Sequence, residues 1–312
     1  MRLSAVVPVL DEEPTLDELY RRLRAVLASL APDHEIVFVN DGSRDGSLER
    51  LRAIASKDAA VVVLDLRRHS GKTAALAAGF AEAKGRVLVT LDSDLQDVPE
   101  EIPKLVAQIE QGADFVTGRK RSRRDPWTRR LASRIFNGVV SLLAGTKVRD
   151  VNSGLKAMTR DVAAELPLHG EMHRFLPVFA AARGFRVVEV DVAHEPRRHG
   201  RSRYGWSRYL AGFLDTATVL LLTRYGTRPL HFFGCFGLLV ALAGGGVLAY
   251  LGIGWLFGQW IGNRPLLVFG VLCVLLGIQC VFFGLLAELV VVAGRRRDEA
   301  LVREVIRGKR GT

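Results

Sequence analysis

Three acidic loops carry the residues of this 312-residue sequence that are best suited to chemistry. They are Asp-Glu-Glu at 11–13, Asn-Asp-Gly-Ser at 40–43 and Asp-Ser-Asp-Leu-Gln-Asp at 92–97, and each follows an apolar run. Proteins hold Mg2+ and Mn2+ with one or two carboxylates together with substrate phosphates. The loops therefore predict a site for a divalent cation and a phosphorylated substrate, with Asp92 and Asp94 as its central pair.

Asp41 and Asp92 also have a simpler interpretation, because Asp is favoured in turns and at helix N-caps of any protein. That interpretation is sufficient for a single Asp. It does not account for Asp92 and Asp94, which flank one residue directly after an apolar run, because two other acidic loops also follow apolar runs that are expected to be strands of one sheet. The pair favours the metal site.

Alternating strands and helices must position these loops. The apolar runs at 3–10, 36–39, 61–64 and 87–91 are continuous, which predicts strands buried on both faces. Helical patterns separate the runs. This alternation predicts a mostly parallel α/β sheet with helices on both sides, in which ligand loops lie at the carboxyl ends of the strands. The three acidic loops should then meet at one edge of the sheet.

The composition excludes several classes of protein. The chain has 44 Lys and Arg against 33 Asp and Glu, a net charge of +11, and is 49% hydrophobic. These values exclude intrinsic disorder and a collagen-like fibre. Its three cysteines all lie between 229 and 294 without a Cys-x-x-Cys spacing, so neither a disulfide framework nor a structural zinc site is expected.

The segment from 229 to 294 differs sharply from the rest, since Arg264 and Glu288 are its only formally charged residues. It contains two apolar stretches, at about 232–257 and 266–293. A helix of about 25 residues spans about 37 Å, enough to cross a hydrocarbon core of about 30 Å. Arginines flank the outer ends, at 224, 228 and 295–297. The positive-inside rule then places both ends of a transmembrane hairpin in the cytoplasm.

These features predict four segments. The first, 1–208, is a cytoplasmic catalytic domain, because its apolar start at 3–10 is too short for a signal peptide and ends in acidic residues. The second, 209–230, is a juxtamembrane amphipathic helix and linker, which would lie in the membrane interface or dock on the protein. The third, 231–294, is the hairpin, and the fourth, 295–312, is a basic cytoplasmic tail.

A nucleotide-binding P-loop is excluded. Gly71-Lys72-Thr73 matches the end of that motif, but the glycine required five residues before Gly71 is Leu66. We expect Gly71 to end a loop between a strand and a helix, with Lys72 at the start of the helix.

Together, the three loops resemble the signature loops of family 2 glycosyltransferases with the GT-A fold. The resemblance lies in Val-Val-Pro-Val-Leu-Asp-Glu-Glu at 6–13, in Val-Asn-Asp-Gly-Ser-Arg-Asp-Gly-Ser at 39–47 and in the 92–97 loop. The Asp-Leu-Gln-Asp continuation and the apolar hairpin are similar to the polyprenyl-phosphate glycosyltransferases, which include the dolichyl-phosphate mannose synthases. The resemblance covers essentially the whole chain. It implies a GT-A catalytic domain followed by a transmembrane helical hairpin.

The resemblance also implies roles for individual residues. Asp92 and Asp94 would form the Asp-x-Asp pair, with Asp94 and Gln96 holding Mg2+ or Mn2+ on the donor diphosphate and Asp92 near the metal and the ribose. The nucleoside pocket would be lined by Pro8, Asp11, Glu13 and Asp41.

Basic residues would bind the phosphates. The resemblance assigns Arg119, Arg129 and Ser133 to the binding of the lipid phosphate, and Arg130 is the alternative to Arg129. It assigns Arg197, Ser202 and Arg203 to a loop that closes over the donor diphosphate. Arginine binds phosphate oxygens bidentately. A solvated surface is the alternative for Arg121, Arg123 and Arg124, and an ordinary loop position is the alternative for His194 and His199. Residues 152–154 resemble a loop on the acceptor side.

The predicted function is inverting, metal-dependent transfer of one sugar from a nucleotide sugar to a polyprenyl phosphate at the cytoplasmic face of the inner membrane. UDP-glucose is the leading donor and GDP-mannose the alternative. A phosphate monoester is already anionic near neutral pH, so its oxygen needs no strong general base. The partners are then the nucleotide sugar, the lipid phosphate and the bilayer, without nucleic acid, and a homo-oligomer is left open.

Three alternatives remain, one of which is a purely structural membrane anchor. A related family 2 enzyme would use another lipid or a glycan as acceptor. A membrane-tethered protein that binds a polyanion such as nucleic acid would explain the arginines but not the acidic loops.

Overall fold

The structure, a computed structural model, describes residues 2–120, 153–195 without 167, 169 and 171, residues 218 and 221, 225–262 without 227, and 265–294. The chain forms two compact units, which meet in the sequence between Leu220 and Leu221. The four predicted segments and their boundaries stay predictions.

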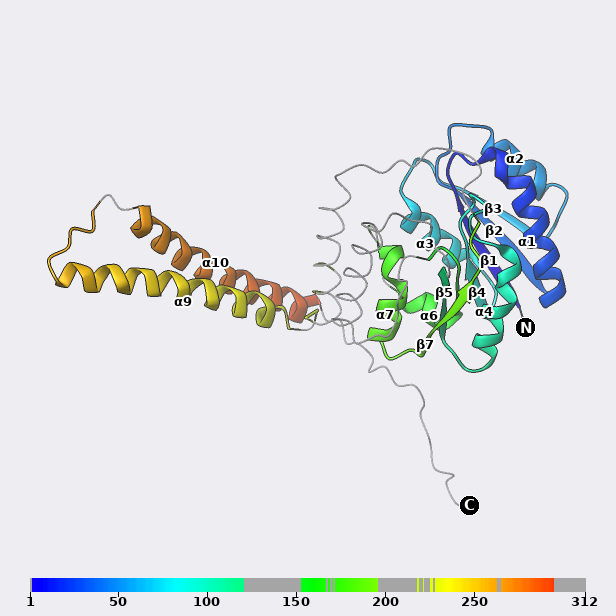
Figure 1. The fold of residues 1–312 in the computed structure, drawn as a ribbon. Coiled ribbons are helices and arrows are strands. Elements are labelled where there is room, and N and C mark those ends of the chain that lie inside the picture. Colours follow the sequence, from blue (N-terminus) through cyan, green and yellow to red (C-terminus); the bar gives the residue numbers. More distant parts are fainter. Residues whose placement is uncertain are drawn as a thin grey trace, which may run out of the picture. The chain divides into compact units, whose positions relative to one another are not determined.

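The first unit is built on a sheet that, in the described residues, has seven strands in the order β3-β2-β1-β4-β6-β5-β7 (Figure 1). The strands are β1 (Leu3–Val9), β2 (His34–Asn40), β3 (Val61–Asp65), β4 (Val87–Thr90), β5 (Phe115–Lys120), β6 (Lys156–Thr159) and β7 (Val187–Val192). Among them β6 pairs antiparallel with both of its neighbours, and the other pairs are parallel. The predicted, mostly parallel α/β sheet is confirmed.

Helices cover both faces of this sheet, because its strands are apolar on both faces. One core joins Leu3, Ala5, Val7 and Val9 of β1 to the first set of helices, and a second core lies on the other side, around Val6. The helices on the first face are α1 (Leu16–Leu30), α2 (Ser47–Ala55) and α4 (Ile102–Glu110). Those on the second face are α3 (Lys72–Glu82), α6 (Arg160–Glu165) and α7 (Leu176–Ala182).

Periodicity explains the helices in turn. In α1 the side chains of Leu16, Leu19, Leu23 and Leu27 are fully buried, at the three- and four-residue spacing of one helix face. Among the described residues of this unit, short 3-10 turns lie at Glu13–Thr15, Pro99–Glu101 and Met172–Phe175.

The second unit contains α9 (Pro229–Leu256) and α10 (Pro265–Gly294), both long and apolar enough to cross a membrane. Their buried positions recur every seven residues, at Gly237, Gly244 and Leu251 of α9 and at Gly270, Gly277 and Gly284 of α10. A Cβ on Gly277 would lie 2.5 Å from the carbonyl oxygen of Gly237, so only glycine allows the two backbones this close. A seven-residue seam of small residues is a recognised way to pair membrane helices. The predicted apolar hairpin is therefore seen in the structure.

One carboxylate lies within this hairpin. Glu288 of α10 accepts a hydrogen bond at 3.2 Å from the backbone N–H of Leu230, in the first turn of α9. The N-terminus of a helix carries unsatisfied N–H groups and a partial positive charge, which offset the cost of placing an acidic group there.

Candidate active site

The three acidic loops follow β1, β2 and β4, which are parallel neighbours in the sheet. Val9 at the end of β1 pairs with Asn40 at the end of β2, so these two loops leave the sheet side by side. Pro8, the predicted nucleoside contact in β1, pairs with Val39 and is partly buried. The topology thus places the predicted site residues of the three loops at one edge.

The first two loops are bound to each other by hydrogen bonds. Asp11 accepts a hydrogen bond from the backbone N–H of Arg44 at 2.7 Å and donates its own N–H to Ser43 Oγ at 3.0 Å. Glu13 accepts from the N–H of Gly46 at 3.0 Å. Asp11 and Glu13, both predicted to line the nucleoside pocket, therefore also fix the position of the second loop.

Asp41 ties the end of β2 to the segment before α3. Its buried carboxylate accepts hydrogen bonds from the backbone N–H groups of Ser70 at 2.7 Å and Gly71 at 3.0 Å, and it lies 2.8 Å from His69 Nδ1. Gly71 has a φ of 91°, a conformation that suits glycine. These contacts bring the start of α3 to the edge where the acidic loops lie, and α3 begins at Lys72 as predicted.

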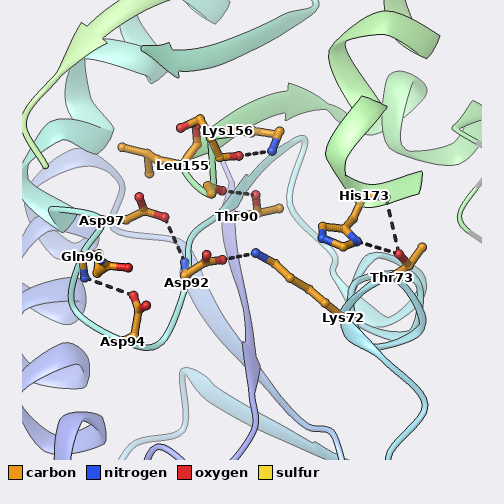
Figure 2. Close-up of polar contacts among 12 residues, drawn as sticks. Lys72, Thr73, Thr90, Asp92, Asp94, Gln96, Asp97, Leu155, Lys156 and His173 are labelled. Atoms are coloured by element: carbon orange, nitrogen blue, oxygen red, sulfur yellow. Dashed lines mark hydrogen bonds and ion pairs between the residues drawn. The ribbon is translucent and has the colours of Figure 1, made fainter. Parts of the chain in front are cut away.

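Lys72 points from the first turn of α3 into the acidic loop and forms an ion pair with Asp92 (Figure 2). Each of the two side chains is about one third exposed. Burial alone would lower the pKa of Lys72, but the charges of Asp92, Asp97 and Asp94 and the hydrogen bond to Asp92 outweigh it and raise that pKa. Lys72 is therefore a cation held among carboxylates.

The sequence alone does not assign Lys72 to the site. Its one signal is the Gly71-Lys72 pair at a helix start, which is an incomplete match to a P-loop.

The loop after β4 is shaped by its own hydrogen bonds. Asp97 is buried and accepts a hydrogen bond from the backbone N–H of Asp92 at 3.2 Å. Asp94 Oδ1 accepts from the N–H of Gln96 at 3.2 Å, and Leu95 between them has a φ of 60° (Figure 2). This turn therefore sets the positions of the predicted Asp-x-Asp pair and of Gln96, which all belong to one short segment.

Gly154 packs directly against this loop. A Cβ at this position would lie 2.9 Å from Cγ of Asp92 and would meet Oδ2 of Asp97. Its carbonyl oxygen accepts a hydrogen bond from the Thr90 hydroxyl at 3.0 Å. Residues 152–154 were predicted on the acceptor side, and the described part of that segment supports the carboxylates.

The other side of Lys72 is formed by buried polar groups. His173 Nδ1 lies 2.8 Å from the Thr73 hydroxyl (Figure 2). Burial and then the charges of Lys72, Lys156 and Arg174 lower the pKa of His173 to about 3. The imidazole is therefore uncharged near neutral pH and supports the first turn of α3 through the Thr73 hydroxyl.

The segment that follows β7 is also bound to the acidic loop. The N–H of Glu195 donates to the carbonyl oxygen of Gln96 at 2.9 Å, and His194 Nδ1 lies 3.8 Å from Asp97 Oδ1. The His194 side chain is about one fifth exposed. His194 thus lies beside Asp97 of the acidic loop.

Arg119, predicted to bind the lipid phosphate, lies in β5 and donates from Nε to Asp191 of β7 at 2.6 Å. This hydrogen bond and the charge of Asp191 raise the pKa of Arg119. The remaining predicted phosphate contacts lie outside the described residues, and these are Arg129, Ser133, Arg197, Ser202 and Arg203.

The donor set fits a divalent cation that is shared with a substrate. No group of three or more His, Cys, Asp or Glu side chains in the described ranges forms a metal site made of protein ligands alone. Mg2+ is typically held by one or two carboxylates plus substrate phosphates, and Asp92 and Asp94 supply that number. The Lys72 ammonium beside Asp92 shows that a positive charge is favoured here.

Comparisons with known proteins identify a matching family model and several relatives. Residues 4–166 match the family model described as glycosyl transferase family 2. The chain is 35% identical over 313 residues to dodecaprenyl-phosphate galacturonate synthase of Rhizobium johnstonii, covering 98% of this chain and 92% of that protein. It is 38% identical to undecaprenyl-phosphate 4-deoxy-4-formamido-L-arabinose transferase of Edwardsiella ictaluri, covering 92% and 87%.

Solved structures are similar at the level of the fold. Glucosyl-3-phosphoglycerate synthase from Mycobacterium tuberculosis, in complex with Mn2+, UDP-glucose and phosphoglyceric acid, has a TM-score of 0.54 and 22% identity. The match covers 70% of this chain and 78% of that one.

Proposed function

Because the chain belongs to glycosyl transferase family 2, we propose that this glycosyltransferase moves one sugar from a nucleotide sugar to the phosphate of a polyprenyl phosphate. Its GT-A-like fold and its two apolar C-terminal helices agree with the prediction from sequence. The observation that carries the proposal is the placement of Asp92 and Asp94 at the end of β4, around a position that attracts positive charge.

Asp94 and Gln96 would hold Mg2+ or Mn2+, with Asp92 close to the metal and the ribose. When bound, the metal would neutralise the negative charge that develops on the departing nucleoside diphosphate. Pro8, Asp11, Glu13 and Asp41 would line the nucleoside pocket, and Asp41 also holds residues 69–71 in place. A solved protein of the same fold contains Mn2+ and UDP-glucose, which supports a UDP-sugar as donor. UDP-glucose is the first donor to test and GDP-mannose the second.

The acceptor oxygen needs little activation, because the second pKa of a phosphate monoester is about 6. We therefore assign no general base, and His173, whose pKa is lowered to about 3, is too weak a base to serve as one. Positioning of the two substrates supplies much of the rate. Arg119, Arg129 and Ser133 would bind the lipid phosphate, and Arg197, Ser202 and Arg203 the donor diphosphate. An anionic acceptor that attacks in one displacement inverts the anomeric carbon.

The apolar helices explain how the enzyme meets a lipid substrate. Each is long enough to cross a bilayer, as α9 has 28 residues and α10 has 30. With arginines at 224, 228 and 295–297 on the outer ends, the positive-inside rule favours a catalytic domain on the cytoplasmic face of the inner membrane.

The test is a donor panel. Membranes that contain the protein are incubated with undecaprenyl phosphate, Mn2+ and, one at a time, radiolabelled UDP- and GDP-sugars. We expect label from one donor in an acid-labile lipid fraction, and EDTA should abolish it. Transfer to a different acceptor, or no incorporation from any donor, would contradict the proposal.

A further inference from the structure

The ammonium group of Lys72 lies in the place where the proposed metal site needs positive charge. Its ion pair with Asp92 joins the first residue of α3 to the loop after β4, 20 residues further along the chain. Asp94 and Asp97 add to the negative potential at the ammonium. Figure 2 shows the side chain extended from α3 across the site to Asp92.

This position is built by the fold. Asp41 fixes the backbone of Ser70 and Gly71, and the Thr73 hydroxyl meets His173 on the other side of the helix start. Lys72 therefore begins from a fixed backbone, but its side chain is about one third exposed and has a flexible four-carbon stem. The ammonium can reach Asp92, and it can also turn toward a ligand at the edge of the site.

A divalent cation at Asp92 and the ammonium of Lys72 would repel each other, because both compete for the same carboxylate within a few ångströms. An entering diphosphate changes this balance. Its oxygens would supply new negative charge, so that Asp92 and Asp94 could hold the metal while the Lys72 ammonium binds a diphosphate oxygen.

From this geometry we propose that Lys72 occupies the cation position at Asp92 until a nucleoside diphosphate enters, and then binds the diphosphate. Metal binding becomes dependent on the nucleotide as a result. The inference rests on the proposed function, since it takes its ligands from a nucleotide-sugar transferase. It adds Lys72 to the donor-binding residues and gives it opposite effects on the two ligands.

A purely structural Lys72 would behave differently. If the ion pair only fixed the rotamer of Asp92, its removal would weaken the binding of metal and of nucleotide together. If Lys72 competes with the metal, its removal strengthens the binding of metal alone and weakens the binding of nucleotide.

The experiment measures Mn2+ binding to the purified full-length protein in detergent by electron paramagnetic resonance, without nucleotide and with UDP or GDP. In the wild type, we expect weak binding of Mn2+ alone and tighter binding with the matching nucleotide. Lys72→Met should lower the Kd for Mn2+ alone about tenfold and raise the Kd for the nucleotide about tenfold, each equal to about 1.4 kcal/mol.

Two variants serve as controls. Lys72→Arg keeps the positive charge and should retain weak binding of Mn2+ alone. Lys57→Met removes an exposed lysine from the connection between α2 and β3, at the other edge of the sheet, and should leave both affinities unchanged. Thermal unfolding checks that each variant is folded, and Lys72→Gln replaces Lys72→Met if the latter is not.

A neutral variant that binds Mn2+ alone no more tightly than the wild type would overturn the inference. Sugar transfer by the wild type is measured on the same preparation. Transfer without the shift in Mn2+ affinity contradicts only the role of Lys72, whereas the shift without transfer supports Lys72 and contradicts the proposed reaction.

Discussion

Gly154→Ala tests how closely the start of β6 shapes the acidic loop. The new Cβ would lie 2.9 Å from Asp92 Cγ and Oδ2, where ordinary contact begins at 3.4 Å, and would also meet Asp97. Asp92 must then move by about 0.5 Å (3.4 − 2.9), and Asp97, whose Oδ2 the new Cβ meets more closely, must move further. Overpacking of this kind destabilises a protein by about 1–3 kcal/mol. Since a misplacement of about 1 Å in a catalytic site lowers the rate about 100-fold, we expect kcat/KM to fall roughly 10- to 100-fold.

The assay is the initial rate of lipid labelling with the donor that the panel identifies, together with thermal unfolding of the same sample. Gly85→Ala is the matched control, because Gly85 lies just before β4 at the opposite edge of the sheet and its new Cβ would crowd Ser4 of β1 and the carbonyl oxygen of Val87. We expect it to lose similar stability but to keep its rate per folded molecule. Wild-type kcat/KM in Gly154→Ala would refute the idea that this contact positions Asp92.

Three further predictions follow from the same structure. Asp94→Asn should lower the rate of Mn2+-dependent transfer roughly 100-fold, as expected when a group that stabilises developing charge is lost. The control, Asp161→Asn on the exposed surface of α6, should retain the wild-type rate. Equal rates in the two variants would show that Asp94 is not part of the metal site. The pKa of His173 is lowered to about 3 from 6.5, so the unfolded chain binds its proton first and stability falls as the pH falls from about 6.5 to about 3. The free energy of unfolding, measured by urea denaturation, should therefore decrease between pH 7 and pH 4.5, and this decrease should be about 2–3 kcal/mol smaller when His173 is replaced by Gln. An equal decrease in both proteins would show that the buried imidazole does not resist protonation. Gly277→Leu should separate α9 from α10 and lower the unfolding temperature of the hairpin in detergent. The control Gly246→Leu should not, because a Cβ on Gly246 meets nothing within 4 Å. Equal unfolding temperatures of the two variants would show that the helices make contact elsewhere.

Local sequence was sufficient for several features of this protein. The strands that precede residues 11–13, 40–43 and 92–97 are continuous apolar runs, and a polar or glycine-containing loop ends each one. Once the sheet is mostly parallel, those loops must share its carboxyl edge. The two long helices were equally predictable, because a run of more than 25 apolar residues has few other structures available.

Other features needed the tertiary structure. The antiparallel β6 lies between β4 and β5 because of long-range pairing, and no local pattern encodes that order. Its placement brings Gly154 against Asp92 and Asp97, far from them in the sequence.

The sequence by itself thus determined which loops would share one edge of the sheet and that the chain would carry an apolar hairpin, because composition and periodicity are local properties. Only the tertiary structure decided what faces those carboxylates. Lys72 reaches Asp92 because Asp41, directly after β2, holds the start of α3 at the sheet edge. A contact that depends on three separate segments is fixed by their packing and by no spacing along the chain.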